Sequence, residues 1–207
     1  MLHVSRPEIR NVKIAIKVDI SKYCPSVLKR RTIETGVNTK HYHNFSIIRT
    51  QYVYSVFWKS GYINITKIPD LHGIEKAVSH ISSILSIDRD HIQPHTIHNI
   101  CASGDFSRTF NLSHLKKALS KEKDINVSRN LSAFPALFLR YPNLGTCVLF
   151  QNGKYSLVGV NEDRKLTHLI RKVHITYIQF RTRDNSLWFL HGSSSCCRIV
   201  CVTFLIR

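Results

Sequence analysis

The sequence runs through the same series of landmarks twice. Each pass contains an apolar segment that begins with Asn, a basic segment, a segment that begins with Phe, a turn that ends in Gly and a helix-like stretch. Corresponding landmarks lie 88 to 92 residues apart, namely Asn11 and Asn99, Phe45 and Phe134, Gly61 and Gly153, and the stretches that start at Asp70 and Asn161. Because unrelated segments rarely keep several landmarks in register, the sequence predicts two copies of one structural unit.

The first copy has the pattern of a sheet followed by a helix. Residues 12–20 alternate polar and apolar side chains, which is typical of a strand with one buried face. Pro25 opens a short basic helix, because proline suits the first helical turn. Residues 45–67 are rich in β-branched and aromatic side chains and predict two or three antiparallel strands. Apolar residues at helical spacing over 71–85 predict an amphipathic helix laid on the sheet, and residues 86–94 link the two copies.

The second copy repeats this order. We expect a strand at 96–103 and a basic helix around 112–121, which Asn111 or Ser113 is able to cap. Further strands are expected at 134–141, 145–151 and 154–160. The closing helix buries a stripe made of Leu166, Leu169, Ile170 and Val173.

The charge balance favours a polyanionic partner. The chain has 30 Lys and Arg residues against 13 Asp and Glu residues, a formal net charge of +17. Such an excess produces a positive field that attracts DNA, RNA or an anionic membrane, and the charge alone does not choose among them. No apolar run approaches the roughly 18 residues of a membrane-spanning helix, and residues 1–20 lack the apolar core of a signal peptide. We therefore expect an intracellular protein.

The sequence offers no catalytic constellation and no metal site. The carboxylates are scattered, no acidic pair flanks a His or Lys, and no Gly-rich phosphate loop is present. Three isolated cysteines in apolar surroundings favour reduced, packed thiols, and these are Cys24, Cys101 and Cys147. The cysteines at 196, 197 and 201 lack the spacing of zinc ligands. We expect no enzymatic activity, no metal and no cofactor.

Two segments of the second copy resemble the TATA-box-binding protein family. Residues 134–140 read Phe-Pro-Ala-Leu-Phe-Leu-Arg and resemble that family's FPGLIYR segment, and residues 148–153 resemble its LIFxSGK segment. The resemblance covers roughly residues 10–180 and includes the duplication, although the first copy matches more loosely.

The resemblance implies a fold of the α/β (α+β) class. The expected architecture is a saddle of two pseudo-symmetric repeats, with a curved antiparallel sheet and helices on its convex face. The implied organisation is an N-terminal extension at 1–9, repeats at 10–93 and 94–180, and a C-terminal tail at 181–207 whose role is not assigned.

The resemblance also implies aromatic wedges. In this family two phenylalanines of each repeat enter base steps from the minor groove and bend the duplex, a mechanism for which the family itself is the known example. The matching positions are Phe45, Trp58, Phe134 and Phe150. Trp58 follows from aligning Gly61 with Gly153, and Phe57 is its alternative, because a one-residue slip turns a strand side chain to the other face. Aromatic residues of this kind are also common in cores.

Other positions match the polar contacts of the family. Asn11 and Asn99 match residues that donate to base edges, and Thr66 matches a further base-edge residue. Amide donors suit the acceptor edges of A·T pairs in the minor groove, although an Asn also starts strands for reasons of turn geometry. Arg49 and Arg140 match phosphate-contacting arginines, which position a protein without reading sequence. Either arginine is also compatible with a solvated edge-strand charge.

Several positions depart from the family pattern. Val158 replaces a threonine, Lys67 replaces a glycine, and Asn64 stands where the family has a groove-facing valine. A polar group there weakens contact with the groove floor. Residues 129–132 replace an acidic segment that docks general transcription factor IIB, and their loss of carboxylates predicts weak docking.

We therefore expect a nuclear DNA-binding transcription initiation factor that binds and bends duplex DNA through the minor groove. Its expected partners are double-stranded DNA and general transcription factors or RNA polymerase machinery, with no membrane and no small-molecule substrate. Two alternatives remain open. The same fold used as a protein-interaction module is the first, and an accessory domain of a DNA-repair glycosylase is the second.

Overall fold

The computed structural model describes residues 7–128 and 134–189, and side chains only as far as residue 180. Ten strands form one antiparallel sheet in the order β2-β3-β4-β5-β1-β6-β10-β9-β8-β7. The strands are β1 Glu8–Lys17, β2 Asn38–His41, β3 Phe45–Arg49, β4 Val53–Phe57, β5 Tyr62–Ile68, β6 Thr96–Asp105, β7 Asn126–Ser128, β8 Ala136–Tyr141, β9 Gly145–Phe150 and β10 Lys154–Val160. Half of the sheet comes from each copy, and the two copies meet where β1 pairs with β6.

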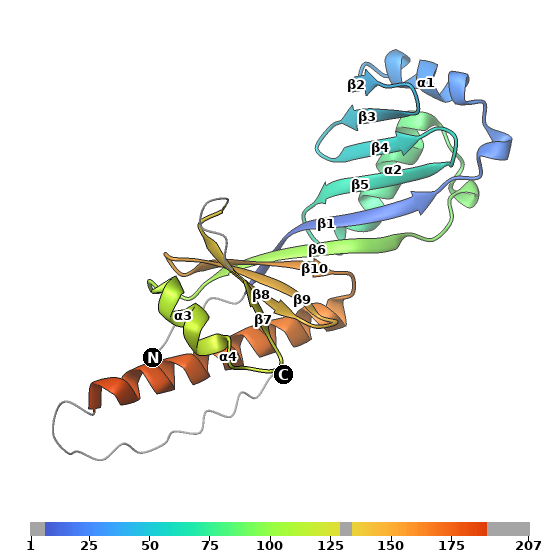
Figure 1. The fold of residues 1–207 in the computed structure, drawn as a ribbon. Helices are drawn as coiled ribbons and strands as arrows, with labels where there is room; N and C mark the ends of the chain where they lie inside the picture. Colours follow the sequence, from blue (N-terminus) through green and yellow to red (C-terminus); the bar gives the residue numbers. More distant parts are fainter. Residues whose placement is uncertain (1–6, 129–133, 190–207) are drawn as a thin grey trace.

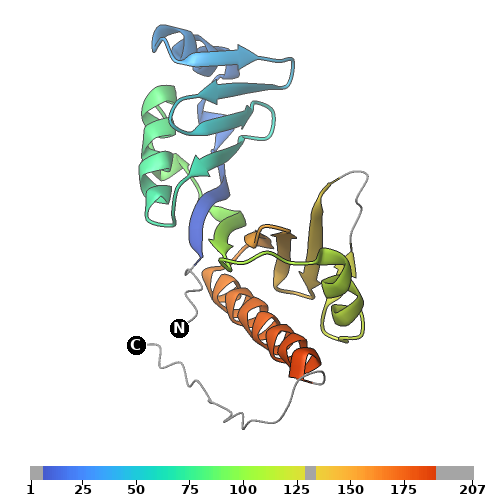
Figure 2. The ribbon, with the colours of Figure 1, turned by 90° about the vertical axis from the view of Figure 1, so that its left-hand side faces the viewer.

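Four α-helices and two short 3₁₀ turns connect and cover these strands. They are η1 Ile20–Lys22, α1 Pro25–Glu34, α2 Gly73–Leu85, η2 Arg89–His91, α3 Leu112–Leu119 and α4 Asp163–Phe189. Figures 1 and 2 show a curved sheet with α2 and α4 along its outer side, one under each half. This arrangement is the expected α+β saddle with two pseudo-symmetric repeats. The exact bounds 10–93 and 94–180 stay predictions.

Helix α2 shows how the sequence fixes the layer order. Helix α2 faces β5 and its neighbours with apolar side chains that are less than 5 % exposed, namely Ile74, Val78, Ile81 and Leu85. Burying one such side chain stabilises the fold by about 2 kcal/mol. The carboxylate of Asp70 accepts a hydrogen bond from the backbone N–H of Gly73 at 2.8 Å and satisfies a free donor at the start of the helix.

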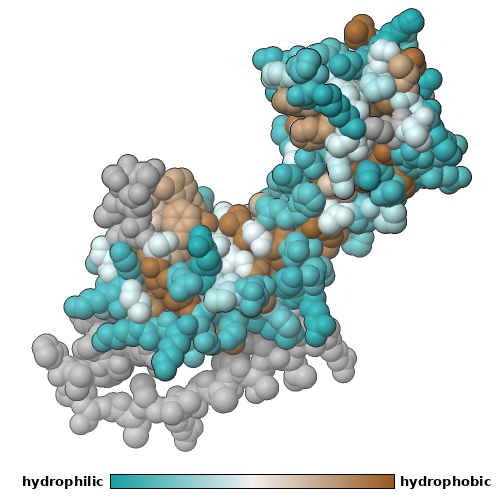
Figure 3. All heavy atoms as spheres, turned by 45° about the vertical axis from the view of Figure 1, so that its right-hand side comes forward, coloured by the Kyte–Doolittle hydropathy of each residue, from teal (hydrophilic) through white to brown (hydrophobic). Residues whose placement is uncertain are grey.

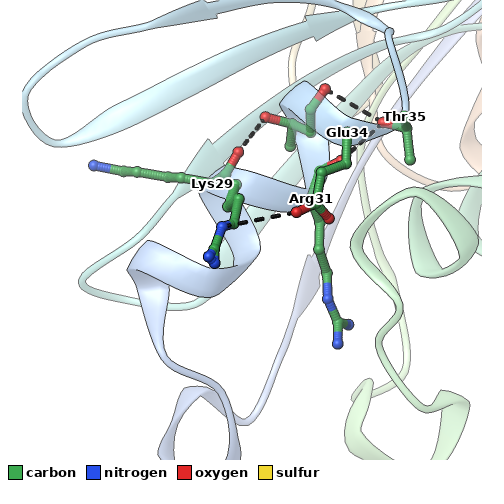
Figure 4. Close-up of polar contacts among 6 residues, drawn as sticks. Lys29, Arg31, Glu34 and Thr35 are labelled. Atoms are coloured by element: carbon green, nitrogen blue, oxygen red, sulfur yellow. Dashed lines mark hydrogen bonds and ion pairs between the residues drawn. The ribbon is translucent and has the colours of Figure 1, made fainter.

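Helix α1 is held by its own polar side chains and by α2. Pro25 occupies its first turn, as the sequence predicts. The buried Thr32 hydroxyl donates to the carbonyl of Lys29 at 2.7 Å, and further contacts of this kind follow along the helix (Figure 4). Arg31 reaches α2, where its guanidinium donates to the carbonyls of Leu85 at 3.0 Å and Ser86 at 2.9 Å. A cation at these terminal carbonyls stabilises the end of α2.

The second copy closes in the same way. Asn111, one of two predicted caps, accepts hydrogen bonds from the N–H groups of Ser113 and His114 at 3.1 and 3.0 Å. Helix α4 packs on β9 and β10 through the predicted stripe, in which Leu166, Leu169 and Val173 are at most 3 % exposed. The same helix continues to Phe189, past the predicted end of the repeat at 180.

Two features differ from the predictions. The edge strands β2 and β7 lie in segments that the sequence pattern leaves without a strand, because four polar residues in β2 and a single Val127 between polar residues in β7 are too short to show alternation. Cys24 is exposed and not packed, because it precedes α1 at the surface. The hydroxyl and backbone N–H of Ser26 and the N–H of Val27 hold the pKa of its thiol below the ordinary value. The remainder of the tail, residues 190–207, lies outside the described residues.

Candidate nucleic-acid interface

Alternation along the strands separates a covered face of the sheet from an open one. In β3 the side chains of Ser46 and Ile48 are fully buried beneath the helices, whereas those of Phe45 and Ile47 on the other face are partly exposed. We call the helix-free side of the sheet the concave face. It holds, among others, Ser55, Asn64 and Thr66 in the N-terminal half and Thr146, Val148, Ser156 and Val158 in the C-terminal half.

An aromatic pair lies at one end of the concave face. Phe45 opens β3 and Phe57 closes β4, and the two residues are direct cross-strand partners. Their rings stack with centroids 5.6 Å apart. Tyr42 extends the stack, with its ring 4.5 Å from that of Phe45. Phe45 therefore lies on the concave face within an aromatic cluster, and its role as a wedge stays a prediction.

A matching pair lies at the other end. The rings of Phe134 and Phe150 meet edge to face with centroids 5.7 Å apart, and Phe138 lies 5.9 Å from Phe134. Phe134 is 43 % exposed, which is unusual for a side chain of this size in a folded protein. The structure therefore brings both predicted aromatic residues of the second repeat together on the concave face.

Trp58 is not part of this arrangement, and its prediction as a wedge is wrong. Its side chain is only 5 % exposed and lies on the helix-covered side of the sheet. The indole N–H donates to the hydroxyl of Ser46, itself fully buried, at 2.9 Å. Phe57, the alternative that the sequence left open, occupies the concave position beside Phe45.

A difference in turn length explains the misassignment. In the first repeat the N–H of Gly61 bonds to the carbonyl of Phe57, four residues earlier, at 3.0 Å. In the second repeat the N–H of Gly153 bonds to the carbonyl of Phe150, three residues earlier, at 3.1 Å. Aligning the two glycines therefore shifts the preceding strand by one residue, and such a shift exchanges the two faces of the sheet.

The centre of the concave face holds the two predicted asparagines. Oδ1 of Asn11 accepts a hydrogen bond from the N–H of Lys67 at 2.8 Å, and Oδ1 of Asn99 accepts one from the N–H of Gly159, also at 2.8 Å. Lys67 and Gly159 adopt positive φ angles of 63° and 78°, and the strand register shifts at both places. Each asparagine is thus fixed by a β-bulge of the neighbouring strand, with its amide N–H₂ group left to other partners.

Two further side chains share this centre. Lys13 is the cross-strand partner of Asn99, and Cys101 is the partner of Asn11. The amide nitrogen of Asn99 donates to Sγ of Cys101 at 3.0 Å. The sequence reasoning missed Lys13, although its place two residues after Asn11 in an alternating strand was sufficient to put both side chains on one face.

Thr66 and Asn64 also reach the concave face, next to the central strands. The hydroxyl of Thr66 donates to the carbonyl of Val53 at 3.4 Å, a long contact that leaves the hydroxyl oxygen able to accept. Asn64 pairs with Ala15 in the adjacent strand. Asn64 therefore adds a polar side chain to the concave face, as expected from the sequence.

The two arginines occupy equivalent outer positions. Arg49 is exposed at the end of β3 and pairs with Asn38 of the edge strand β2. Arg140 is exposed in β8 and pairs with Asn126 of the edge strand β7. Both lie one strand in from an edge of the sheet, a location suited to the phosphate backbone on either side of a groove.

Surface composition fits a polar ligand. On the face seen in Figure 3, hydrophobic residues form separate patches, and hydrophilic residues lie between them. Lys40 lies over the ring of Tyr42 at 5.3 Å, beside the first aromatic pair. Cations and aromatic rings side by side are the combination that binds nucleic acids through both phosphates and bases.

Within 7–128 and 134–180, no group of three or more His, Cys, Asp or Glu side chains is arranged to hold a metal ion. None of the described helices is long and apolar enough to cross a membrane. Residues 129–132, from which weak docking of transcription factor IIB is predicted, lie in the undescribed segment 129–133.

Comparisons with known proteins bear on this site. Residues 94–176 match the family model "Transcription factor TFIID (or TATA-binding protein, TBP)". The TBP of Methanococcus jannaschii has a similar structure, with a TM-score of 0.63 and 17 % sequence identity over 84 % of this chain and 99 % of that chain. A heterotetrameric sarcosine oxidase from Corynebacterium sp. U-96 overlaps 84 % of this chain and 83 % of its own with 8 % identity and a TM-score of only 0.32, which carries no weight. No curated protein sequence matches the chain significantly.

The family model covers the second repeat, in which the sequence resemblance is sharper, while the structural match extends the same fold over both repeats. These findings confirm the predicted resemblance and the predicted fold.

Proposed function

We propose that this chain acts as a DNA-binding factor of the TATA-binding protein type, whose concave face binds the minor groove of duplex DNA and bends the duplex. The match of residues 94–176 to the TATA-binding protein family model and the shared fold support this proposal. The observation that carries the proposal is the pair of aromatic clusters at opposite ends of this face. The rings of Phe45 and Phe57 lie 5.6 Å apart, and those of Phe134 and Phe150 lie 5.7 Å apart. Two apolar wedges separated by a groove-binding surface are what is needed to unstack a base step at each end of a site.

The centre of the face supports contact with base edges. Asn11 and Asn99 have their Oδ1 atoms occupied by backbone N–H groups, so their amide nitrogens are the groups that would donate to DNA. One N–H of Asn99 donates to Sγ of Cys101, which leaves its second N–H for a ligand. Minor-groove edges of A·T pairs present acceptors only, and an amide donor matches them. Thr66 stands close by as a further polar contact.

Charge supports the affinity of the proposed complex. Arg49 and Arg140 lie at equivalent outer positions and would contact phosphates on either side of the groove. A formal charge of +17 adds a sequence-independent attraction that depends on salt.

The proposed biological role is transcription initiation. The helices on the convex side, α1 to α4, would contact general transcription factors or RNA polymerase machinery while the concave face holds DNA. The protein would act wherever the DNA is, which is the nucleus in a cell that has one; the fold itself also occurs in a TBP from Methanococcus jannaschii. Weak docking of transcription factor IIB, argued from residues 129–132, belongs to the same proposal.

The first experiment is a mobility-shift comparison of three probes: a duplex with a TATA sequence, a G·C-rich duplex and a single strand. Binding to duplex probes above the single strand supports the proposal, and the order of the two duplexes reports sequence preference. Bending is then measured by energy transfer between dyes at the two duplex ends. The Phe134→Ala and Phe150→Ala double variant should lose the bend and keep its thermal unfolding transition.

A matched control is Ile175→Ala, which removes a 50 % exposed apolar side chain from α4 on the opposite side of the sheet. Its bend angle should equal that of the parent. If the double variant unfolds, the two rings are core residues and the wedge assignment fails.

One observation favours the second candidate, a protein-interaction module. Asn64 and Lys13 place an amide and a cation where a groove floor calls for apolar contact. Failure to bind any duplex at low salt would select that alternative.

A further inference from the structure

Four side chains define the exact centre of the concave face. Asn11 stands opposite Cys101, and Lys13 stands opposite Asn99. Between these two cross-strand pairs, Val12 and Ile100 form a third pair that points to the helices and is fully buried. The pseudo-two-fold axis of the saddle therefore passes through the Val12 and Ile100 pair.

A rotation about this axis superposes each residue of β1 on its counterpart in β6. One pair of counterparts is chemically identical, and the other pair is not. Asn11 and Asn99 exchange, and each keeps the same 2.8 Å hydrogen bond to a bulge residue. Lys13 exchanges with Cys101, an ammonium group on one side of the axis and a neutral thiol on the other. Among these four side chains, the symmetry is therefore broken by one charge.

The ammonium group of Lys13 is available to a ligand. None of the ion pairs among the described residues includes Lys13, and its side chain is partly exposed between the two buried neighbours Val12 and Ile14. Cys101, in contrast, already accepts the hydrogen bond from Asn99 at 3.0 Å.

The two groups respond differently to base pairs. An ammonium group only donates hydrogen bonds, so it is favoured beside the acceptor edges of A·T pairs and opposed by the amino group of guanine. The narrow minor groove of A·T-rich DNA also concentrates negative potential, which attracts Lys. A thiol is a weak donor and a weak acceptor and has little preference.

We propose that the exchange of Lys13 for Cys101 across the axis fixes the direction in which the saddle lies on duplex DNA, with the N-terminal half over the half-site that has A·T pairs beside the centre. This rests on the proposed binding of DNA by the concave face. The two aromatic clusters mark the ends of the bound segment, so each half of the chain faces one half-site.

The test uses a duplex whose half-sites differ only beside the centre, with A·T pairs on one side and G·C pairs on the other. Tyr42, at the outer end of the first repeat, is replaced by photo-crosslinking benzoylphenylalanine. The position of the crosslink on an end-labelled strand reports which end of the duplex lies next to that repeat. The parent should crosslink about tenfold more at the A·T end, the discrimination expected of one good base contact.

Three variants test whether Lys13 sets this direction. Lys13→Met should bring the ratio of the two crosslinks close to one, because it removes the charge and keeps the length of the side chain. The exchange of Lys13→Cys with Cys101→Lys should reverse the ratio. Lys76→Met, which removes an exposed lysine from α2 on the convex side, should leave it unchanged.

Thermal unfolding of each variant checks the fold, and the total crosslink yield checks binding. A parent ratio near one, or an exchange variant that keeps the parent direction, overturns the inference while DNA binding stands. Failure of the parent to crosslink either duplex end, together with no mobility shift, overturns the proposed function itself.

Discussion

The backbone N–H of Gly159 donates a hydrogen bond to Oδ1 of Asn99 at 2.8 Å, and this contact orients the asparagine on the concave face. Lys67 does the same for Asn11. The sequence alone makes these asparagines strand residues, and the bulges of the adjacent strands determine that Oδ1 of each amide is occupied and that the amide nitrogen is left to other partners.

Replacing Asn11 or Asn99 by Asp should separate folding from binding. The carboxylate keeps the acceptor for the bulge N–H, so the thermal unfolding temperature should change little. It removes the amide donor and places a negative charge before the DNA, so the affinity should fall by about tenfold or more. Fluorescence anisotropy with a labelled duplex measures it. Unchanged affinity in both variants would show that the centre of the face does not contact bases.

Lys67→Gly should stabilise the protein. Lys67 has a φ of 63°, a conformation that costs a residue with a Cβ about 1 kcal/mol and costs glycine almost nothing. Urea unfolding should show a free energy of unfolding higher by up to about 0.5 kcal/mol, because the entropy of glycine in the unfolded chain offsets part of the relieved strain. The converse change, Gly159→Ala, should lower it. A destabilised Lys67→Gly variant would mean that the side chain contributes more than its backbone strain costs.

Phe57→Ala and Trp58→Ala should have opposite consequences, although the residues are neighbours. Phe57 lies on the concave face, so its loss should abolish bending by the first repeat and cost about 1 kcal/mol of stability. Trp58 is buried and bonded to Ser46, so its loss should cost about 3 kcal/mol or more. Energy transfer on end-labelled DNA and urea unfolding distinguish the two. A bending defect found only in Trp58→Ala would show that Trp58 is the wedge, as the alignment of Gly61 with Gly153 implies.

Arg49→Ala and Arg140→Ala should change the salt dependence of binding. If each arginine neutralises one phosphate, each variant should reduce the slope of log affinity against log salt by about 1 and weaken binding alike for all sequences. Arg171→Ala, on the exposed side of α4, is the matched control and should leave the slope unchanged. If the slopes of all three variants equal that of the parent, neither strand arginine contacts a phosphate.

His174 should make stability depend on pH. Burial lowers the pKa of its imidazole below the ordinary value of 6.5, and its ring nitrogen lies 3.2 Å from the hydroxyl of Tyr155. The unfolded chain therefore binds the proton more readily, and the free energy of unfolding should fall as the pH drops from about 6.5 through the lowered pKa. His174→Gln should flatten this dependence, whereas His168→Gln, at an exposed position, should not. Stability that stays constant over this range would show that the imidazole is solvated.

The duplication and the strand alternation are written in the sequence, and they determined the order of the main strands and helices and the faces that these bury. These are local properties, because a period of two or of 3.6 is written in the chain. Phe45, Phe134 and Phe150 were instead assigned from the family resemblance, and the short edge strands β2 and β7 were missed. The choice between Phe57 and Trp58 could not be read from such a period, since it depends on a turn that is one residue longer in the first repeat.

Only the tertiary structure placed Lys13 beside Asn99 and Cys101 beside Asn11, because cross-strand register joins residues almost ninety positions apart. It also decided that Lys67 and Gly159 both form bulges, although only one of them is a glycine. A lysine accepts the left-handed conformation there because the surrounding sheet and the hydrogen bond to Asn11 outweigh its local cost.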